Sequence, residues 1–282
     1  VLKNQRPGIK QLLTGLSGSA KTLFLATIYK QQPLLIIESN TFQANQVADD
    51  LSNLLNSDQI YTFPVEEVMA AEMAVSSPES RAERVRTLSF LATGKKGIVI
   101  TSVAGMRRLL PTARQWQDSQ LTINTDSEVD PQALAAQLGE MGYFRDKLVG
   151  KPGEFAMRGD IIDIFPLDAE NPVRIELFDT EVDSLRSFEA DTQRSIENLD
   201  SVQIMPATDL LANTAQLEMA GEALQAAYEA VAAKITDKTE QKQLATNFET
   251  PIERLLAGER VENLALFVDY LYPDQSSLID YF

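Results

Sequence analysis

The sequence predicts an α/β fold in which a parallel-sheet domain carries an inserted α+β domain. Three observations support this prediction. In the first third of the chain, short apolar runs alternate with helix-length amphipathic segments, which is typical of a parallel sheet covered by helices. Between residues 154 and 188 the apolar residues recur with a period of two, which indicates an antiparallel β-meander. After Pro206 the chain is rich in Ala, Glu and Gln, which favours helices.

These patterns divide the chain into three expected parts. They are an α/β domain at residues 1–118, an α+β domain at 119–208, and a helical segment at 209–282 that leads into a truncated second part of the α/β domain.

The first part is expected to alternate strands with helices. Strands are predicted at residues 10–18, before a glycine loop, and at 33–40, 59–64 and 96–106. Helices are predicted between them, at 19–32, 41–55 and 76–93. Either Ser77 or Ser80 is suited to cap the third helix. Strands separated by helices imply a parallel, doubly wound sheet.

The second part is expected to begin with a strand and a helix. Asp130 is placed to cap that helix, Pro131 occupies its first position, and Gly139 or Gly142 is placed to end it. The strands of the meander are predicted at residues 154–166, 171–179 and 181–189. The third part ends in the apolar stretch SSLIDYF, so we expect the chain to be a piece of a longer protein.

Composition excludes several classes of function. The chain has no cysteine and no histidine, which excludes disulfides, thiolate chemistry and the usual general base and metal ligand. Its net charge of -16 repels a phosphodiester backbone, which argues against tight binding to DNA by this chain alone. No apolar run is long enough for a membrane span, and the first residues lack the layout of a signal peptide. We therefore expect a cytoplasmic protein with no membrane partner.

A near match to a phosphate-binding loop lies close to the start of the chain. In the pattern G-x-x-x-x-G-K-[ST], Gly15 is the first residue and Lys21 and Thr22 are the last two, with Gly18 in the loop between them, but Ala20 stands where the second glycine belongs. A methyl group at that position crowds the phosphate or conflicts with the backbone angles, at a cost of about 1 to 2 kcal/mol. We interpret the segment as a degenerate, inactive P-loop of an NTPase domain.

ATP hydrolysis also needs an acidic residue that holds magnesium at the end of another strand. Glu38 ends an apolar run, but that run is more simply the strand next to the loop. Asp269 follows another apolar run, yet the apolar residues there fall at helical spacing. We therefore expect this chain to be no enzyme and to hold no cofactor, catalytic residue or metal.

The meander carries a candidate surface for a protein partner. Alternation places Arg174, Glu176 and Phe178 on the face opposite the apolar residues of their strand. In the preceding strand it groups Arg158 with Asp160, Ile162 and Ile164, and Arg158 joins the patch if the strands pair in register. Residues 158–194 hold ten acidic residues, four arginines and no lysine. Arginines beside an aromatic residue are typical of an interface hot spot, and their planar forks pair with carboxylates.

Less specific interpretations remain for these and other residues. Phe178 can pack beneath the helix at 131–138, with the arginines merely offsetting nearby acids. Arg107, Arg108, Arg114 and Trp116 can touch nucleic acid, although a solvated helix end at a domain boundary explains them more simply. The acidic pairs Asp49-Asp50 and Glu66-Glu67 lack metal-ligand spacing and suit solvated helix faces.

The meander and its flanks also resemble a known family. The stretch from GEFAMRGDIIDIFP to SVQIMPA is similar to the module that the UvrB excinuclease subunit shares with the bacterial transcription-repair coupling factors (Mfd). The P-loop-like start, the segment PVEEVMAAEMAVSSPESRAERVRTL and the final PDQSSLIDYF extend the resemblance over nearly the whole chain. Ala20, the absence of tyrosine between Phe63 and Pro78, and the stretch FEADTQRSIENL favour the coupling factors over UvrB.

The resemblance implies a RecA-like, UvrB-like fold and a role as a non-catalytic interaction module. In the family, this module recruits the UvrA subunit to a stalled RNA polymerase and helps to repress the motor of the full-length protein. Arg158, Arg174 and Phe178 match positions that contact UvrA, and we add Glu176 to this partner-binding set. ATP, magnesium, RNA polymerase and DNA are then expected to bind only through domains absent from this chain, and intramolecular contacts with those domains are also expected.

Two rival functions stay open at this point. The first is an ATP-dependent, UvrB-type excinuclease or helicase subunit that binds damaged DNA through a working Lys21. The second is a DNA-binding module, which would show a steep salt dependence of its affinity for duplex DNA.

Overall fold

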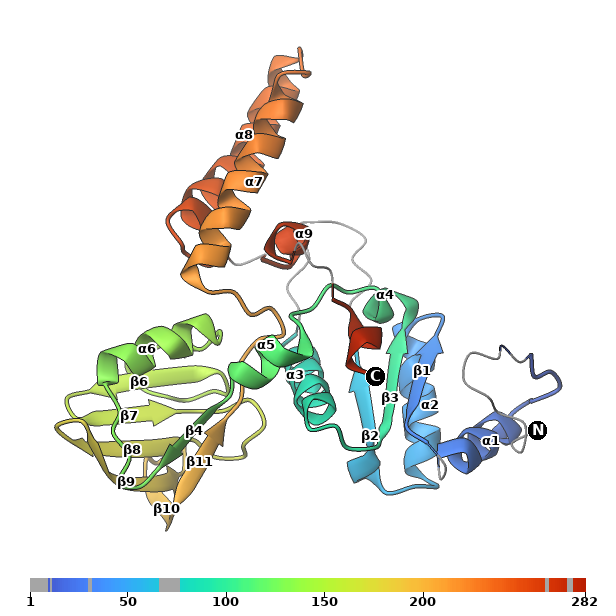
Figure 1. The fold of residues 1–282 in the computed structure, drawn as a ribbon, viewed down its shortest axis with the longest axis horizontal. Coiled ribbons are helices and arrows are strands. Elements are labelled where there is room, and N and C mark those ends of the chain that lie inside the picture. Colours follow the sequence, from blue (N-terminus) through green and yellow to red (C-terminus); the bar gives the residue numbers. More distant parts are fainter. Residues whose placement is uncertain (1–9, 11, 30–31, 66–76, 262–263, 273–275) are drawn as a thin grey trace.

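The structure is a computed structural model that describes residues 10, 12–29, 32–65, 77–261, 264–272 and 276–282. Figure 1 shows three parts: a parallel sheet with its helices, a larger and mostly antiparallel sheet with one covering helix, and a projecting pair of long helices. The fold is therefore mixed α/β, as the sequence predicts, with a parallel sheet, a mostly antiparallel sheet and a two-stranded antiparallel pair.

The parallel sheet has the strand order β1-β3-β2 among the described residues. Its strands are β1 (Leu34–Glu38), β2 (Ile60–Phe63) and β3 (Ile98–Ser102), and both outer strands pair with β3 in parallel. Every residue of β3 is buried. Its alternating side chains enter two different apolar clusters, one on each face, so helices cover both faces of the sheet.

Local capping signals fix the helices of this part. They are α1 (Ser19–Tyr29), α2 (Thr41–Ser52), η2 (Ser57–Gln59), α3 (Pro78–Ala92), α4 (Val103–Met106) and α5 (Ala113–Asp118). The Asn40 side chain caps α2, and the Ser77 side chain, rather than that of Ser80, caps α3. Thr112 and Gln115 form a capping box at α5.

The strand predicted at residues 10–18 is not formed. In its described part, residues 10 and 12–17 have no regular structure, and the side chain of Leu12 is 89% exposed. A strand needs a neighbour for its backbone groups, and β3 already has one on each side. A further strand would have to join at β1 or β2, and in the described residues none does.

The larger sheet has six strands in the order β10-β9-β8-β7-β6-β5. Neighbouring strands are antiparallel except for the parallel pair of β5 and β6. The strands are β5 (Phe144–Arg145), β6 (Glu154–Arg158), β7 (Ile161–Ile164), β8 (Val173–Phe178), β9 (Glu181–Phe188) and β10 (Ser195–Asn198). A separate antiparallel pair joins β4 (Leu121–Asn124) to β11 (Ser201–Ile204).

One face of the six-stranded sheet packs against α6 (Pro131–Glu140). Asp130 caps α6 as predicted, and Gly142, with φ +88°, follows the end of the helix. The apolar cluster beneath α6 includes Ile162, Ile164 and Ile175. The opposite face of the sheet is therefore the one left for polar side chains.

The predicted strand at 154–166 is two strands. Gly159 takes φ +59°, a left-handed backbone that favours glycine, and the chain reverses there between β6 and β7. The reversal changes the pattern of faces, so the prediction that Arg158 shares a face with Ile162 and Ile164 is wrong. Those isoleucines lie in the core, and the Arg158 side chain reaches Asp163 instead.

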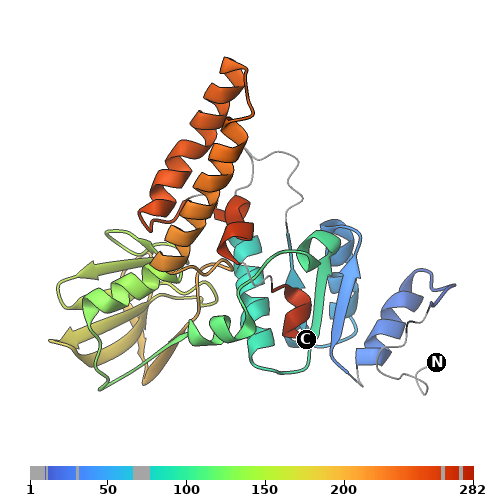
Figure 2. The ribbon, with the colours of Figure 1, turned by 45° about the horizontal axis from the view of Figure 1, so that its top comes forward.

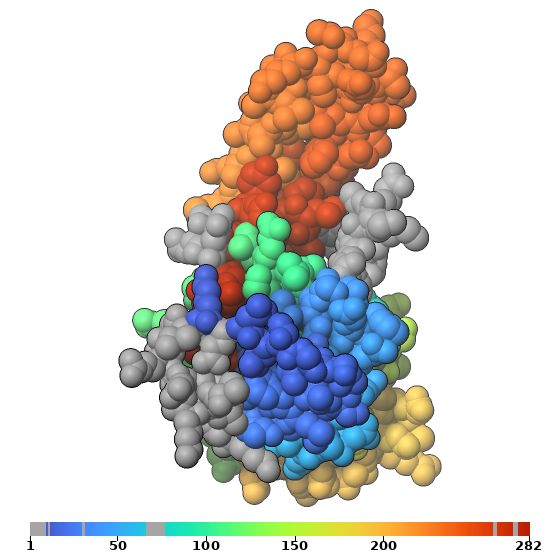
Figure 3. Space-filling model, turned by 90° about the vertical axis from the view of Figure 1, so that its right-hand side faces the viewer, coloured from blue at the N-terminus to red at the C-terminus, as the bar shows by residue number. Residues whose placement is uncertain are grey.

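The last part of the chain is helical, as predicted. Helices α7 (Thr214–Ala232) and α8 (Lys238–Leu256) pack along each other, and Figures 2 and 3 show that this hairpin projects away from both sheets. Short turns follow at η4 (Leu264–Phe267), α9 (Val268–Leu271) and η5 (Leu278–Tyr281), so Asp269 is helical as expected. No helix in the described residues combines the length and apolar character needed to span a membrane.

A buried cluster of charges joins the parts. The carboxylate of Asp209, just before α7, accepts bonds from Arg84 of α3 at 3.2 Å and from Arg108 at 2.7 Å. Burial raises the pKa of Asp209, but the charges and hydrogen bonds of the two arginines outweigh that effect and lower its pKa overall. Arg260 adds bonds to the carbonyl groups of Leu210 and Glu140. The segment that leaves the six-stranded sheet is thus tied to the α/β part.

Candidate interaction surface

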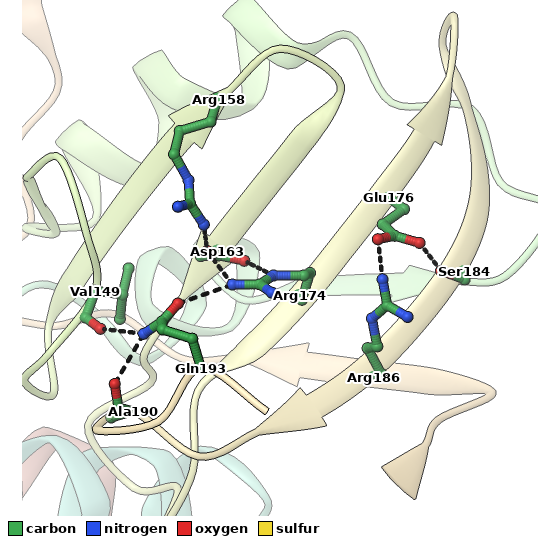
Figure 4. A network of polar contacts seen from close by, with 9 residues as sticks. All are labelled: Val149, Arg158, Asp163, Arg174, Glu176, Ser184, Arg186, Ala190 and Gln193. Carbon is green, nitrogen blue, oxygen red and sulfur yellow. Dashed lines mark hydrogen bonds and ion pairs between the residues drawn. The ribbon is translucent and has the colours of Figure 1, made fainter. Parts of the chain in front are cut away.

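The polar face of the six-stranded sheet carries a network centred on Asp163, shown in Figure 4. Asp163 belongs to β7 and is fully buried. Its neighbours in the chain, Ile162 and Ile164, lie in the apolar core beneath α6, and Asp163 lies on the other face of the sheet. Its carboxylate accepts a two-pronged bond from Arg174 of β8, at 2.7 and 2.8 Å, and a bond from Arg158 of β6 at 2.7 Å. Paired bonds from a planar guanidinium are among the stronger polar contacts in proteins.

Arg174 is held on every side. Its Nη2 atom also donates to the side-chain oxygen of Gln193 at 2.9 Å, and its guanidinium lies 4.3 Å above the centre of the Phe188 ring. The Gln193 amide donates in turn to the carbonyl groups of Ala190 and Val149. The hydrogen bond to Asp163 raises the pKa of Arg174, so this arginine is fixed in its charged form.

Glu176 belongs to a second, neighbouring cluster on the same sheet. Its carboxylate pairs with Arg186 of β9 and accepts a bond of 2.9 Å from the hydroxyl of Ser184. All three side chains are half-buried. Glu176 therefore offsets a neighbouring arginine within the sheet.

Phe178 lies at the end of β8 and is 77% exposed. A shift in register between Glu176 and Leu177 precedes it, and Leu177 enters the core while Phe178 does not. The alternative in which Phe178 packs beneath α6 is therefore wrong. An exposed phenylalanine leaves a large apolar surface in water, and such surfaces are common in docking sites.

The structure thus separates the four predicted residues. Phe178 is open to solvent and the Arg158 side chain is 43% exposed, whereas Arg174 is mostly buried by Gln193 and its loop. The expectation that Arg174 faces solvent is wrong because that loop covers this end of the face. The alternative that the arginines offset nearby acids holds for both, because Arg158 and Arg174 each pair with Asp163.

Sequence reasoning missed Asp163, Gln193 and Arg186. Asp163 could have been noticed as a lone charge within the apolar stretch IIDIF, because an isolated charge in such a run needs a partner. Gln193 carried no signal of this kind. It has a left-handed backbone with φ +60° and meets Arg174 only through the fold.

The P-loop-like segment places its key side chains beside acids. The Lys21 Nζ atom is 2.5 Å from a carboxylate oxygen of Glu38, at the end of β1, and the hydroxyl of buried Thr22 is 3.5 Å from Asp50. Gly15 and Gly18 have positive φ, but Ala20 has none and lies within α1. Of the two objections to Ala20, only crowding of a phosphate by its methyl group therefore applies.

The other basic and acidic residues singled out in the sequence do not gather into a site. Trp116 is fully buried, Arg108 binds Asp209, and exposed Arg114 lies 3.7 Å from Asp118. Glu66 and Glu67, and most of the stretch from Phe63 to Pro78, lie outside the described residues. Within the described residues, no three acidic side chains are grouped to hold a metal ion.

Comparisons with known proteins give the chain its relatives. Residues 121–210 match the family model described as the UvrB interaction domain. The whole chain is 41% identical, over 284 aligned positions, to the transcription-repair-coupling factor of Bacillus subtilis (strain 168) and spans 24% of its length. It is 39% identical over 275 positions to the coupling factor of Staphylococcus aureus (strain bovine RF122 / ET3-1), where 96% of this chain aligns with 23% of the relative.

The chain thus spans about a quarter of the length of these relatives. The matched residues 121–210 contain β4 to β11, α6 and the whole Asp163 network. On these matches, the whole chain is similar to one part of the transcription-repair-coupling factors, and its residues 121–210 match the UvrB interaction domain.

Proposed function

We propose that this chain is a non-catalytic recruitment module that binds the UvrA subunit of nucleotide-excision repair. The observation that carries the proposal is the exposed Phe178, 77% open to solvent, on a sheet that also presents Arg158 within the UvrB interaction domain. We call Arg158, Arg174, Glu176 and Phe178 the docking surface. Phe178 supplies its apolar anchor, and Arg158 supplies a partly exposed cation for a carboxylate of the partner.

The proposal extends to the longer protein to which this chain would belong. The relatives are named transcription-repair-coupling factors, which supports a role in coupling transcription to repair. From the resemblance, we propose that the longer protein brings repair proteins to a lesion-stalled RNA polymerase in the cytoplasm. Contacts with RNA polymerase, DNA and ATP would then lie in other parts of that protein. We also propose that the docking surface helps to hold the full-length motor in a repressed state, which the resemblance alone supports.

Two features of the α/β part support a non-catalytic role. Lys21 pairs with Glu38, which leaves its charge neutralised where a phosphate would need it, and the strand that precedes a working P-loop is not formed in the described residues. A net charge of -16 also weakens the case for a DNA-binding module.

Binding of purified UvrA to two matched variants tests the proposal. Phe178→Ala removes the exposed anchor, and we expect about a 30-fold weaker affinity, the loss of roughly 2 kcal/mol typical of a hot spot. Phe144→Ala is the control, because Phe144 is 75% exposed in β5, at the edge of the same sheet. Calorimetric titration measures both. Equal affinity of Phe178→Ala and the unmodified chain would overturn the assignment of the docking surface.

A second pair of variants tests the cation. Arg158→Ala should weaken UvrA binding about 5-fold or more, since a charge-assisted contact is lost. Arg145→Ala, at an exposed position in β5, should leave it unchanged. Arg174→Ala is less informative, because it would also leave the buried Asp163 without its main partner.

A further inference from the structure

The buried Asp163 lies behind the docking surface and does not belong to it. A fully buried carboxylate is costly unless its oxygens are bonded, and the fold gives Asp163 three bonds from two arginines. Arg174 satisfies both oxygens by itself. The bond to Arg158 is therefore additional to those that give each oxygen a partner.

That additional bond fixes the direction of Arg158. Asp163 itself has one orientation, because Arg174 grips both its oxygens and is in turn held by Gln193 and Phe188. The Oδ2 atom of Asp163 then holds one nitrogen of Arg158 at 2.7 Å, while much of the Arg158 side chain stays exposed. A guanidinium has five N–H donors. Within the described residues Arg158 uses one of them, in its bond to Asp163, so other donors remain for a partner.

We propose that Asp163 is a positioning residue of the docking surface, which acts on UvrA through Arg158. This inference rests on the function proposed above. A free arginine side chain loses considerable rotamer freedom when a partner immobilises it. Because Asp163 already holds Arg158 in one direction, the side chain loses its rotamer freedom when the chain folds. This loss of entropy therefore does not weaken the binding of UvrA. Gln193 acts in the same way but less directly, because it holds Arg174, and Arg174 holds Asp163.

A double-mutant cycle on the whole chain tests the proposal. The variants are Asp163→Asn, Arg158→Ala and the two combined, and the measurement is the dissociation constant for UvrA. We expect Asp163→Asn to weaken binding about 3- to 10-fold when Arg158 is present, as one released side chain would. When Arg158 is already Ala, the same change should have little further effect, because Arg174 is only 13% exposed and stays held by Gln193 and Phe188. A residue with a purely structural role would weaken binding equally in both backgrounds, and that result would overturn the proposal.

Further variants keep the result decisive. Asp160→Asn alters an exposed carboxylate in the same β6–β7 turn and should leave the affinity unchanged. If Asp163→Asn does not fold, as judged by near-ultraviolet circular dichroism, the cycle is repeated with Gln193→Ala. We expect a loss of about 2- to 3-fold that again disappears without Arg158. An equal loss in both backgrounds, or no loss at all, contradicts the inference.

The failure of the inference and that of the proposed function are distinguishable. If Arg158→Ala and Phe178→Ala both bind UvrA as the unmodified chain does, the docking surface is wrong and Asp163 has nothing to position. If both weaken binding while Asp163→Asn acts equally in each background, the docking surface stands and the role of Asp163 as a positioning residue fails.

Discussion

Arg108 donates a 2.7 Å hydrogen bond to Asp209, across 101 positions of the chain. Arg108 follows α4 in the α/β part, and Asp209 lies where the chain returns from the UvrB interaction domain. Arg84 completes the cluster, and both its side chain and that of Asp209 are only 3% exposed. The docking surface is thus carried by a domain whose exit is tied to its neighbour by buried charges.

Removing the charge of Asp209 should destabilise the whole chain. Asp209→Asn keeps the shape of the side chain but leaves two arginines without their shared counter-charge, and breaking such a buried pair costs about 3 to 5 kcal/mol. Urea unfolding followed by circular dichroism measures the change. Asp118→Asn is the control, because its exposed pair with Arg114 should contribute less than about 1 kcal/mol. Similar losses in the two variants would contradict this account of the cluster.

Asp209 should also make stability depend on acid pH. Because its pKa in the folded chain is lowered, it contributes stability above its unfolded pKa of about 3.9, and this is lost as the pH falls through the folded value. Between about pH 5 and pH 2 the free energy of unfolding should fall more steeply for the unmodified chain than for Asp209→Asn. Near pH 7 this group adds no slope. Parallel curves for the two proteins over the acid range would contradict the prediction.

The close packing of α7 on α8 should make any side chain larger than that of Gly221 destabilising. A Cβ atom at Gly221 would lie 2.7 Å from the backbone nitrogen of Leu256, and backbone cannot move aside as a side chain can. We expect Gly221→Ala to lower the free energy of unfolding by about 1 to 2 kcal/mol, even though alanine favours helices. Gly139→Ala in α6 has open space around the new methyl group and should instead raise it by up to about 1 kcal/mol. Thermal unfolding measures both changes.

The P-loop-like segment should not bind nucleotide. Titration with a fluorescent ATP analogue and magnesium should give no saturable signal at micromolar concentrations, because Glu38 already neutralises Lys21 and the Ala20 methyl group crowds a phosphate. Lys21→Ala should give the same flat titration. Saturable binding that Lys21→Ala abolishes would revive the rival, ATP-dependent function.

Features set by neighbouring residues were predicted from the sequence. The cap of α6 by Asp130 and that of α3 by Ser77 depend on contacts two or three positions along the chain, and both are confirmed. The Gly159 reversal was missed because the alternating residues on either side of it fit one long strand. Shifting the second half to its own strand moves every side chain to the other face, which is why the neighbours of Arg158 were wrong.

The contacts that define the candidate surface depend on the fold. Arg174 was predicted as exposed because period-two alternation says only which face a residue occupies, and not what covers that face. Arg174 is covered by Gln193, which lies 19 positions further along the chain. No pattern within β8 could have predicted that contact. Phe178 was placed correctly away from the core, and unlike Arg174 it stays 77% exposed.

One consequence follows from the pairing of β4 with β11, in which Leu121 lies opposite Ile204. β4 is the first strand of the UvrB interaction domain and β11 is its last, and the two run side by side. Both connections between this domain and the rest of the chain therefore lie close together. Growth or shrinkage of the intervening segment need not disturb the parallel sheet. Such an arrangement lets an inserted binding domain be transferred as a whole between proteins that otherwise differ.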